Sequence, residues 1–307
     1  MHGPLVEQTV GWPNDEQLAA MQAIATRSWL LGVPVNSEAT VGELAWAHRR
    51  ELADNEWLLI YEGGDLLAWG RLSPTERIRV STEREALSDA SLAWQTGPAH
   101  RELLARIVHW AADRAHPLQT TVRAEDAAAL ELLAGRIAPI PDAPWSAYNV
   151  RGLEAIEPPV VPEGFRLTTY ADTRDDARRI EVHRASWEST TFSQESFDRL
   201  RRTWPYREDL DVLVVAPDGT HVASVLAWFD ERAGLGEFEP VGTHPAFRQQ
   251  GLARAANLFA MQRLKSLGAT LVAVACRGDD AYPIPARLYA SVGFRRLYRD
   301  VPVRLTT

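Results

Sequence analysis

Hydrophobic and polar positions change along residues 237–259 from the period of a strand to the period of a helix. Residues 237–243 (EFEPVGT) alternate with a period of two, as a half-buried strand does. Four later apolar residues fall on one stripe of a helix, namely Leu252, Ala255, Ala256 and Phe259. Gly251 lies between the two patterns, so the sequence predicts a strand, a glycine-containing turn and a helix in succession.

The rest of the second half predicts the same mixture of strands and helices. A proline-rich stretch at residues 152–165 interrupts any regular element, and we place a domain boundary there, which gives domains of residues 1–155 and 156–307. The elements expected after this break are a strand at 166–170, helices at 173–187 and 194–204, a strand at 212–216, a turn at 217–219, a strand through 226–228, the strand and helix described above, a strand at 270–276, a helix around Tyr289 and a strand from Phe294.

The first half repeats this order with different residues. The expected elements are helices at 15–30 and 38–52, a strand at 57–61, a turn at 63–65, a strand through 67–69, a helix at 101–114, a strand at 118–123 and a helix at 125–135. The Leu-Ala-Trp triplet at 67–69 recurs at 226–228, which favours an internal repeat. An unrelated α/β domain is the alternative interpretation of the first half.

Length and charge narrow the classes of partner. At 307 residues the chain suits two domains of about 150 residues each. Its formal net charge of −8 argues against nucleic acid as a partner and is favourable to a cationic substrate. Cys276 is the only cysteine, so there is no internal disulfide, and no Cys/His cluster has metal-site spacing. No apolar run approaches the ~18 residues of a membrane span and no leader pattern opens the sequence, so we expect a cytoplasmic protein with no membrane partner and no metal.

Residues 248–253 (RQQGLA) have the composition of an anion-binding turn. A turn that opens a helix leaves backbone N–H groups without partners, and the helix dipole adds partial positive charge at the same place. A side chain at Gly251 would obstruct the close approach of an anion. The turn is therefore predicted to bind a pyrophosphate.

Two motifs in the second half resemble the signatures of the GNAT superfamily of N-acetyltransferases. The pattern Arg-x-x-Gly-x-Ala at 248–253, preceded by x-x-Pro at 243–245, is similar to the acyl-CoA pyrophosphate loop of that superfamily. About forty residues later, 286–294 (ARLYASVGF) resembles its second signature, a helix with Leu-Tyr followed by Gly-Phe. Both motifs occur in the expected order with a strand between them, and the resemblance covers residues from about 165 to 301.

The resemblance implies a fold class and a cosubstrate. The fold would be an α+β mixed sheet in two tandem GNAT-like domains, each of mostly antiparallel strands flanked by helices and splayed at the cofactor site. The cosubstrate would be acetyl-CoA, with its pantetheine arm along Val241, Gly242 and Thr243 and a β-bulge at Gly242. The pyrophosphate contacts would come from the turn and the start of its helix, namely Arg248, Gln249, Gln250, Gly251, Leu252, Ala253 and Arg254.

Acetyl transfer to an amine needs a base and a proton donor, because an alkyl ammonium has a pKa of ~10.4 and the leaving group is a thiolate. Glu237 and Glu239 alternate onto the same face of the 237–243 strand, where the resemblance implies a base or a water relay to one; the alternative is an exposed strand face. We prefer Glu239. The resemblance makes Tyr289 the general acid near the thioester sulfur, with a core tyrosine or a cofactor-orienting residue as the alternatives.

Several residues depart from the pattern or admit other roles. Tyr282 stands where the family often has an asparagine that binds the pantetheine arm, and we include it among the cofactor-binding candidates. Cys276 is interpreted as a core residue rather than a covalent acyl carrier, and His244 as a solvated turn residue. In the first half, Pro98 lacks an N–H donor at the place of the pyrophosphate turn, and no Arg-x-x-Gly-x-Ala occurs there. We therefore expect a degenerate first repeat with a structural or substrate-shaping role.

The sequence as a whole favours an N-acetyltransferase that transfers an acetyl group directly, in a ternary complex, to a primary amine of a small molecule. It resembles tandem members of the superfamily in which only the second half is active. The alternative, from a different class, is a non-catalytic CoA-binding sensor or scaffold. The acceptor amine, the acyl-chain preference and the oligomeric state are left open, because acceptor specificity lies in loops such as 189–195 that carry no readable code.

Overall fold

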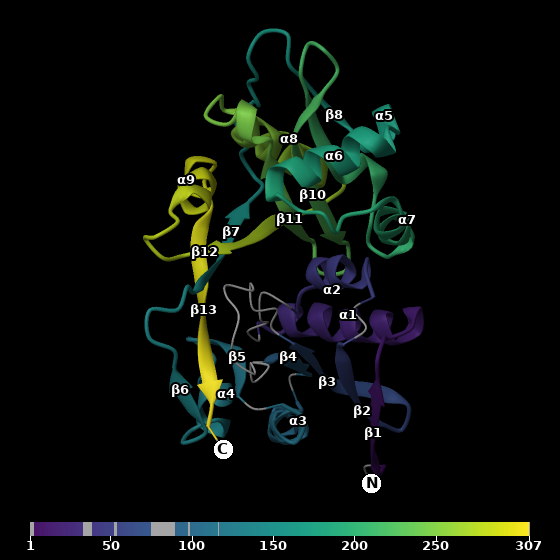
Figure 1. Cartoon of the computed structure of the whole chain (residues 1–307), viewed down its shortest axis with the longest axis vertical. Helices are drawn as coiled ribbons and strands as arrows, with labels where there is room; N and C mark the ends of the chain where they lie inside the picture. Colours follow the sequence, from purple (N-terminus) through teal and green to yellow (C-terminus); the bar gives the residue numbers. More distant parts are fainter. Residues whose placement is uncertain are drawn as a thin grey trace, which may run out of the picture. The chain divides into compact units, whose positions relative to one another are not determined.

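The computed structural model describes residues 3–32, 39–51, 54–74, 90–97, 99–115 and 117–306. The chain forms two compact units. Unit 1 consists of Met1–Thr40, Glu51–Ser146 and Tyr298–Thr307, and unit 2 of Val41–Arg50 and Ala147–Leu297. Figure 1 shows the elements of both units.

Unit 2 is built on a mixed sheet of six strands in the order β7-β12-β11-β10-β9-β8. The strands are β7 (Ser146–Gly152), β8 (Arg166–Thr169), β9 (Asp211–Val215), β10 (His221–Asp230), β11 (Leu235–Thr243) and β12 (Leu271–Arg277). The helices are α2 (Val41–His48), α5 (Tyr170–Thr173), α6 (Asp176–Trp187), α7 (Gln194–Arg202), α8 (Leu252–Ser266) and α9 (Ile284–Ser291), with short 3₁₀ turns at Glu208–Leu210 and Pro245–Phe247. All pairs from β8 to β11 are antiparallel, and β11 pairs with β12 in parallel.

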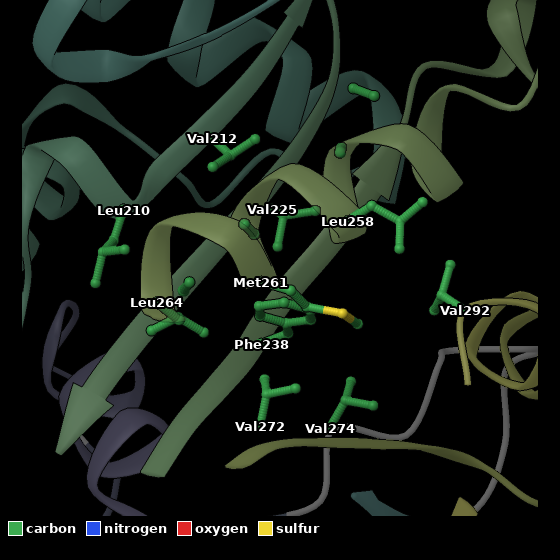
Figure 2. Packing of buried hydrophobic residues seen from close by; sticks show 14 of the residues in the cluster. Leu210, Val212, Val225, Phe238, Leu258, Met261, Leu264, Val272, Val274 and Val292 are labelled. Atoms are coloured by element: carbon green, nitrogen blue, oxygen red, sulfur yellow. The ribbon is translucent and has the colours of Figure 1, made fainter. Parts of the chain in front are cut away.

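The central strands of unit 2 are buried on both faces because their alternating side chains enter two different cores. On one face, strand residues pack against α8, as Figure 2 shows for Val225 and Phe238 around Met261 and Leu264. On the other face, Leu226 and Trp228 of β10 pack with residues from α6, α7 and α2. Helix α2 is therefore part of a hydrophobic core of unit 2, although it comes from the first half of the sequence.

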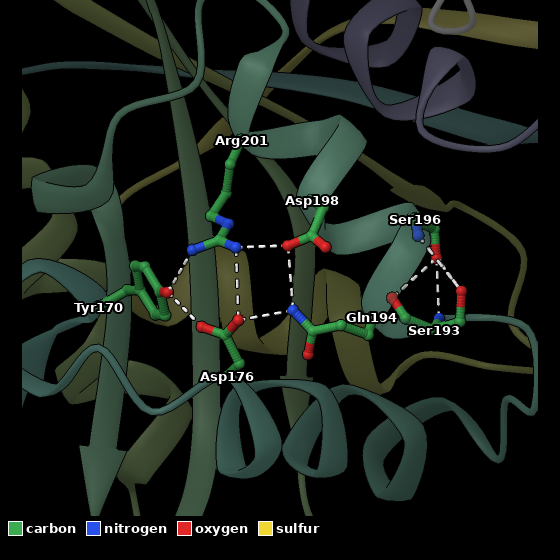
Figure 3. Close-up of polar contacts among 7 residues, drawn as sticks. All are labelled: Tyr170, Asp176, Ser193, Gln194, Ser196, Asp198 and Arg201. Carbon is green, nitrogen blue, oxygen red and sulfur yellow. Dashed lines mark hydrogen bonds and ion pairs between the residues drawn. The ribbon is translucent and has the colours of Figure 1, made fainter.

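Helices α5, α6 and α7 are joined by a polar network shown in Figure 3. The Arg201 guanidinium donates to the Tyr170 hydroxyl at 2.7 Å and pairs with Asp176 and Asp198. The Gln194 amide donates to Asp176 at 2.6 Å and to Asp198 at 3.0 Å. Burial, followed by hydrogen bonding to Asp176, raises the pKa of Tyr170 to about 12, so the phenol stays protonated as the donor to that carboxylate. The network fixes α6 relative to α7.

Unit 1 repeats the strand order of unit 2. Its sheet runs β1-β2-β3-β4-β5-β13, with β6 also paired to β13. The strands are β1 (Leu5–Val10), β2 (Glu56–Glu62), β3 (Asp65–Pro74), β4 (Ala90–Thr96), β5 (Leu118–Arg123), β6 (Ile137–Pro139) and β13 (Arg295–Leu305), and the helices are α1 (Asp15–Leu30), α3 (Leu103–Ala112) and α4 (Ala127–Leu132). As in unit 2, four strands are antiparallel and the fourth pairs with the fifth in parallel.

The two units exchange their last strands. Strand β7 follows the first repeat in sequence but lies beside β12 in unit 2, and β13 follows the second repeat but pairs with β5 in unit 1 through Asp300–Leu305. The units therefore differ from the expected domains 1–155 and 156–307 at three segments, including α2. The break at 152–165 was a reasonable boundary in sequence, but strand pairing connects residues far apart in the chain.

The expected mixed sheet and most expected elements are present, with shifts of a few residues at their ends. The helix expected at 38–52 is shorter, spanning Val41–His48. The sequence analysis missed four strands, β1, β4, β6 and β7. Pro98, on which part of the first-repeat interpretation depends, lies outside the described residues.

Candidate functional site

The sheet of unit 2 opens between β11 and β12. These strands pair over only three positions, from Leu235 with Leu271 to Glu237 with Ala273. Beyond them β11 continues to Thr243, paired on its other edge with β10 alone. Val241, Gly242 and Thr243 thus carry backbone groups on an edge that β12 does not cover, as expected for the segment assigned to the pantetheine arm.

The β-bulge lies two residues earlier than expected. The register shift between β10 and β11 falls between Val225 and Ala227, opposite Glu239 and Pro240, whereas Gly242 pairs regularly with Ser224. Pro240 has no N–H to donate to a ladder, which explains an irregularity at this point. Gly242 is required for another reason: a Cβ atom there would lie 2.7 Å from Cβ of Ser186. The prediction of a bulge at Gly242 was wrong.

The predicted anion-binding turn has the backbone geometry of a cradle. Gln249 and Gly251 both adopt positive φ, at 64° and 77°, and Gly251 is the N-cap of α8. None of the six amides of residues 249–254 donates to an acceptor among the described residues. The next amide, that of Ala255, donates to the Gly251 carbonyl at 3.0 Å. A Cβ at Gly251 would meet nothing within 4 Å, so the space in front of the turn is open.

The two arginines of the turn have partners on the protein. Arg248 donates to the carbonyl oxygens of Thr243 and Ser186, each at 3.3 Å. Arg254 forms an ion pair with Glu157. Both arginine side chains therefore lie at the turn, and Arg254 would have to exchange Glu157 for an incoming anion.

Glu237 and Glu239 lie on one face of β11, opposite the α8 core that contains Phe238. Glu237 is 4% exposed, and its Oε2 accepts a hydrogen bond from the Gly42 amide at 3.1 Å. Glu239 is half-buried. Burial, and then the negative charge of Glu237, raise the pKa of Glu239 from 4.5 to about 7, against a smaller opposing effect of Arg49. The interpretation as an exposed strand face does not hold for Glu237.

Tyr289 lies on α9 and is 6% exposed, with its ring packed edge-on against Phe294 at 5.5 Å between centroids. Burial raises its pKa well above 10, and the charges of Glu239 and Cys276 raise it further. The pKa of Tyr289 is therefore coupled to the charges of Glu239 and Cys276. No hydrogen bond joins the Tyr289 hydroxyl to another described residue.

Cys276 lies on β12 beside a residue that the sequence analysis missed. Asn149 of β7 donates to the Val274 carbonyl at 3.3 Å and lies 3.5 Å from the Cys276 sulfur. Burial raises the pKa of the Cys276 thiol, so the thiolate needed for covalent catalysis is disfavoured. The interpretation of Cys276 as a packed residue is consistent with this.

The remaining candidates lie at the periphery. Tyr282 is 43% exposed, with the Arg277 guanidinium 5.9 Å from its ring centroid. The His244 ring accepts a hydrogen bond from the Ala246 amide. In the 189–195 loop, Phe192 is buried in the core that β10 forms with α2, α6 and α7, and Ser193 caps the start of α7. Only part of that loop is therefore free to contact a substrate.

Arg49, just after α2, and His183 on α6 lie in the surroundings of Glu237 and Glu239. The sequence analysis did not identify either residue. Arg49, which follows α2, influences both Glu239 and His183 electrostatically. The His183 ring packs against Phe192 at 4.5 Å and Trp46 at 5.3 Å, and burial lowers its pKa to about 3. His183 and Arg49 carried no local signal, because their role depends on contacts between segments more than 130 residues apart.

Among the described ranges, no group of three His, Cys, Asp or Glu side chains has the geometry to hold a metal ion. Over the same ranges, no helix is long and apolar enough to cross a membrane.

Sequence comparison identifies relatives of about half of the chain. Residues 178–294 match the profile of the acetyltransferase (GNAT) family. A mycothiol acetyltransferase from Thermobispora bispora is 31% identical over 155 residues, which are 48% of this chain and 52% of that protein. A mycothiol acetyltransferase from Rhodococcus erythropolis is 31% identical over 163 residues, 49% of this chain and 54% of that protein. The alignments thus span about half the length of these relatives.

Solved structures resemble the chain over nearly its whole length. A GCN5-related N-acetyltransferase from Sphaerobacter thermophilus aligns with a TM-score of 0.58 at 20% identity, covering 98% of this chain and 95% of that one. A tandem GNAT protein from the clavulanic acid biosynthesis pathway aligns with a TM-score of 0.61 at 15% identity, covering 98% of both. At these identities the likeness concerns the fold.

Proposed function

We propose that the chain transfers an acetyl group from acetyl-CoA to a primary amine of a small molecule, because its residues 178–294 match the acetyltransferase (GNAT) family. The reaction would take place in unit 2, with both substrates bound together. In it the amine nitrogen bonds to the thioester carbonyl carbon, the carbon–sulfur bond breaks, one proton leaves the amine and one reaches the thiolate.

The observation that carries this proposal is the set of six unpartnered amides at residues 249–254, beside the open edge of β11. A helix start leaves its first amides without intrahelical acceptors, and αL residues before it present further donors at the same place, which suits phosphate oxygens. The donors fit a pyrophosphate, and the edge of β11 that β12 leaves uncovered along Val241–Thr243 fits the amides of a pantetheine arm. Acetyl-CoA, when bound, supplies the acetyl group and the thiolate leaving group.

Glu239 is suited to accept the amine proton. A base works best when its pKa lies near the operating pH, and a pKa of about 7 meets that condition better than the usual carboxylate value. The ionised Glu239 also attracts the ammonium form of the acceptor before the proton is removed. Glu237, held by the Gly42 amide, maintains the negative charge that raises the pKa of Glu239.

Tyr289 is suited to donate the proton to the thiolate. Its raised pKa makes it a weak acid in the resting site, but the burial that raises it also raises the basicity of a thiolate nearby, as it does for Cys276. The charge of Glu239 contributes to the raised pKa of Tyr289. When Glu239 takes a proton its charge disappears, so uptake at one residue makes release at the other easier.

The acceptor is proposed from the relatives. The two mycothiol acetyltransferases suggest the amine of a thiol precursor as one candidate, with amino acids, polyamines and aminoglycosides as others. The acidic pair Glu237 and Glu239 favours a cationic acceptor in every case. The first repeat is proposed to be structural or substrate-shaping.

Release of free thiol from acetyl-CoA, measured against a panel of small amines, tests the proposal. We expect release that depends on one amine class and that is lost in Tyr289→Phe and Glu239→Gln variants. Binding of acetyl-CoA without thiol release with any amine would instead identify a CoA-binding sensor or scaffold. No binding at all would contradict both functions.

A further inference from the structure

We infer that Arg49 is a positioning residue for the catalytic carboxylate Glu239, and that α2 brings it there by docking through Gly42. This inference rests on the proposed function, because it assigns a role to residues outside the segment that matches the family. The family match begins at residue 178, and α2 comes from the first half of the chain. Nothing in the local sequence around residues 41–50 indicates a role in catalysis.

Helix α2 packs closely against β11 and β10. A Cβ atom at Gly42 would lie 2.4 Å from Oε2 of Glu237 and 2.5 Å from Cδ1 of Trp228, so only glycine permits this approach. The Gly42 amide then donates to Glu237 at 3.1 Å. An N-terminal helix amide favours the ionised form of a carboxylate, both as a hydrogen-bond donor and through the helix dipole. Docking of α2 therefore gives the Glu237 carboxylate a hydrogen-bond donor inside the core.

The same helix fixes the Arg49 side chain. The guanidinium lies over the Trp46 ring at 3.7 Å, and its Nη1 donates to the Trp46 carbonyl at 2.5 Å. Trp46 is in turn 8% exposed and packed against His183 and Phe192. A guanidinium stacked on a buried, packed ring has few alternative positions. Arg49 is thus held in place beside α2, and its positive charge favours ionisation of Glu239.

The charges around Glu239 come from three elements. Glu237 on β11 opposes its ionisation and Arg49 favours it, while Tyr289 on α9 interacts with it as a neighbour. Arg49 itself faces Arg50, Glu43 and, on α6, His183. Burial and Arg50 lower the pKa of Arg49 to about 10, so Arg49 remains charged at neutral pH. Glu237 and Arg49 therefore act on Glu239 with opposite signs.

Carbon-13 NMR titration of glutamate carboxyls tests this arrangement without requiring turnover. The full-length protein is labelled at the glutamate δ-carbon, and the Glu239 signal is assigned by its loss in Glu239→Gln. We expect a titration midpoint near 7 in the wild type. Arg49→Met should move it upward by about one pH unit and Glu237→Gln downward by about one, each a tenfold change in the protonation equilibrium. The acid limb of kcat/KM should move in the same directions.

Two matched variants separate charge from folding. Arg49→Lys keeps the charge and should keep the wild-type midpoint, whereas Arg50→Met removes a neighbouring charge and should leave it unchanged. A wild-type midpoint in folded Arg49→Met, or shifts of the same sign in Arg49→Met and Glu237→Gln, would overturn the inference. If the wild type releases no thiol with any amine, the proposed function fails, while the NMR midpoints still decide the role of Arg49.

Discussion

The parallel strand pairs of the two units start alike and then diverge. In unit 1, β4 pairs with β5 over three positions from Ala90 with Leu118, just as β11 pairs with β12 in unit 2. In unit 1, however, the first three amides of α3 donate to backbone carbonyls, beginning with Leu103 to His100 at 3.0 Å, whereas the first three amides of α8 in unit 2 have no acceptor among the described residues. The same sheet topology can thus be followed by a helix whose first amides are hydrogen-bonded or by one whose first amides are free.

The carboxylate pair shows the same contrast. Ala90, Leu92 and Trp94 of β4 pack in the core with α3, so Ser91 and Ala93 occupy the opposite face. That face of β11 carries Glu237 and Glu239. Unit 1 therefore preserves the sheet without the acid pair, which agrees with a structural or substrate-shaping role. The candidate acetyltransferase site therefore depends on a few residues of unit 2 and not on the fold, which both units share.

The largest expected effect is the loss of acetyl-CoA binding in Gly251→Trp. The indole would fill the open space in front of the six free amides, and we expect affinity to fall more than about 100-fold, the loss of about 3 kcal/mol of binding energy. Gly268→Trp is a matched control, because Gly268 also has a positive φ with nothing within 4 Å and lies just beyond the other end of α8. Calorimetry on both folded variants measures the difference; equal affinities would remove the turn from the site.

The next effect is on turnover in Tyr289→Phe. The change keeps the ring and its packing on Phe294 but removes the proton donor. General acid catalysis contributes about 10²–10⁴ in rate, so kcat should fall in that range with little change in the Michaelis constant for acetyl-CoA. Steady-state kinetics with the best amine distinguishes this from cofactor orientation, which would raise the Michaelis constant instead. If the variant keeps more than about a third of wild-type kcat, the loss is far smaller than general acid catalysis predicts. Tyr289 would then be a packing residue.

A similar but pH-dependent effect is expected for Glu239→Gln. The raised pKa of about 7 predicts that wild-type kcat/KM falls as pH drops below 7, since the base becomes protonated. The variant should lose about 10²-fold at pH 8 and show no acid limb near 7. A pH profile of kcat/KM measures both features. An unchanged acid limb in the variant would assign the titration to another group.

The smallest effect concerns stability through His183. Its pKa of about 3 in the folded protein lies below the usual 6.5, so the unfolded state binds more protons between these values and stability is lost as pH falls below 6.5. His183→Phe should flatten this slope by about 1.4 kcal/mol per pH unit between about pH 4 and 5.5, where the unfolded histidine is protonated and the folded one is not. Denaturant unfolding measures it, with His109→Phe as an exposed control. Equal slopes in wild type and His183→Phe would place the charge-sensitive group elsewhere.

Local patterns predicted most of the candidate site from the sequence. The strand with Glu237 and Glu239, the Gly251 turn and the Tyr289 helix were all found, because each depends on the period of a few consecutive residues. The roles of these residues stay predictions. Positive φ at Gln249 was not expected, since a non-glycine residue in that conformation has no sequence signal beyond its context.

Features that depend on distant residues could not be predicted in this way. The exchange of β7 and β13, the docking of α2 and the Asn149 contact to β12 all join segments separated by more than 100 residues. The sequence of α2 is that of a short, mostly buried helix, and the close approach of Gly42 to Trp228 explains its glycine. The two compact units therefore combine segments that no single boundary along the sequence separates.

Counting acetyl-CoA sites on the full-length chain tests the central claim that unit 2 alone carries the cofactor site. Calorimetric titration should give one site per chain in the wild type and none in Gly251→Trp, because the free amides of residues 249–254 belong to unit 2. Two tight sites in the wild type would contradict the account and assign cofactor binding to unit 1 as well, and one remaining site in Gly251→Trp would contradict the assignment of the site to the turn.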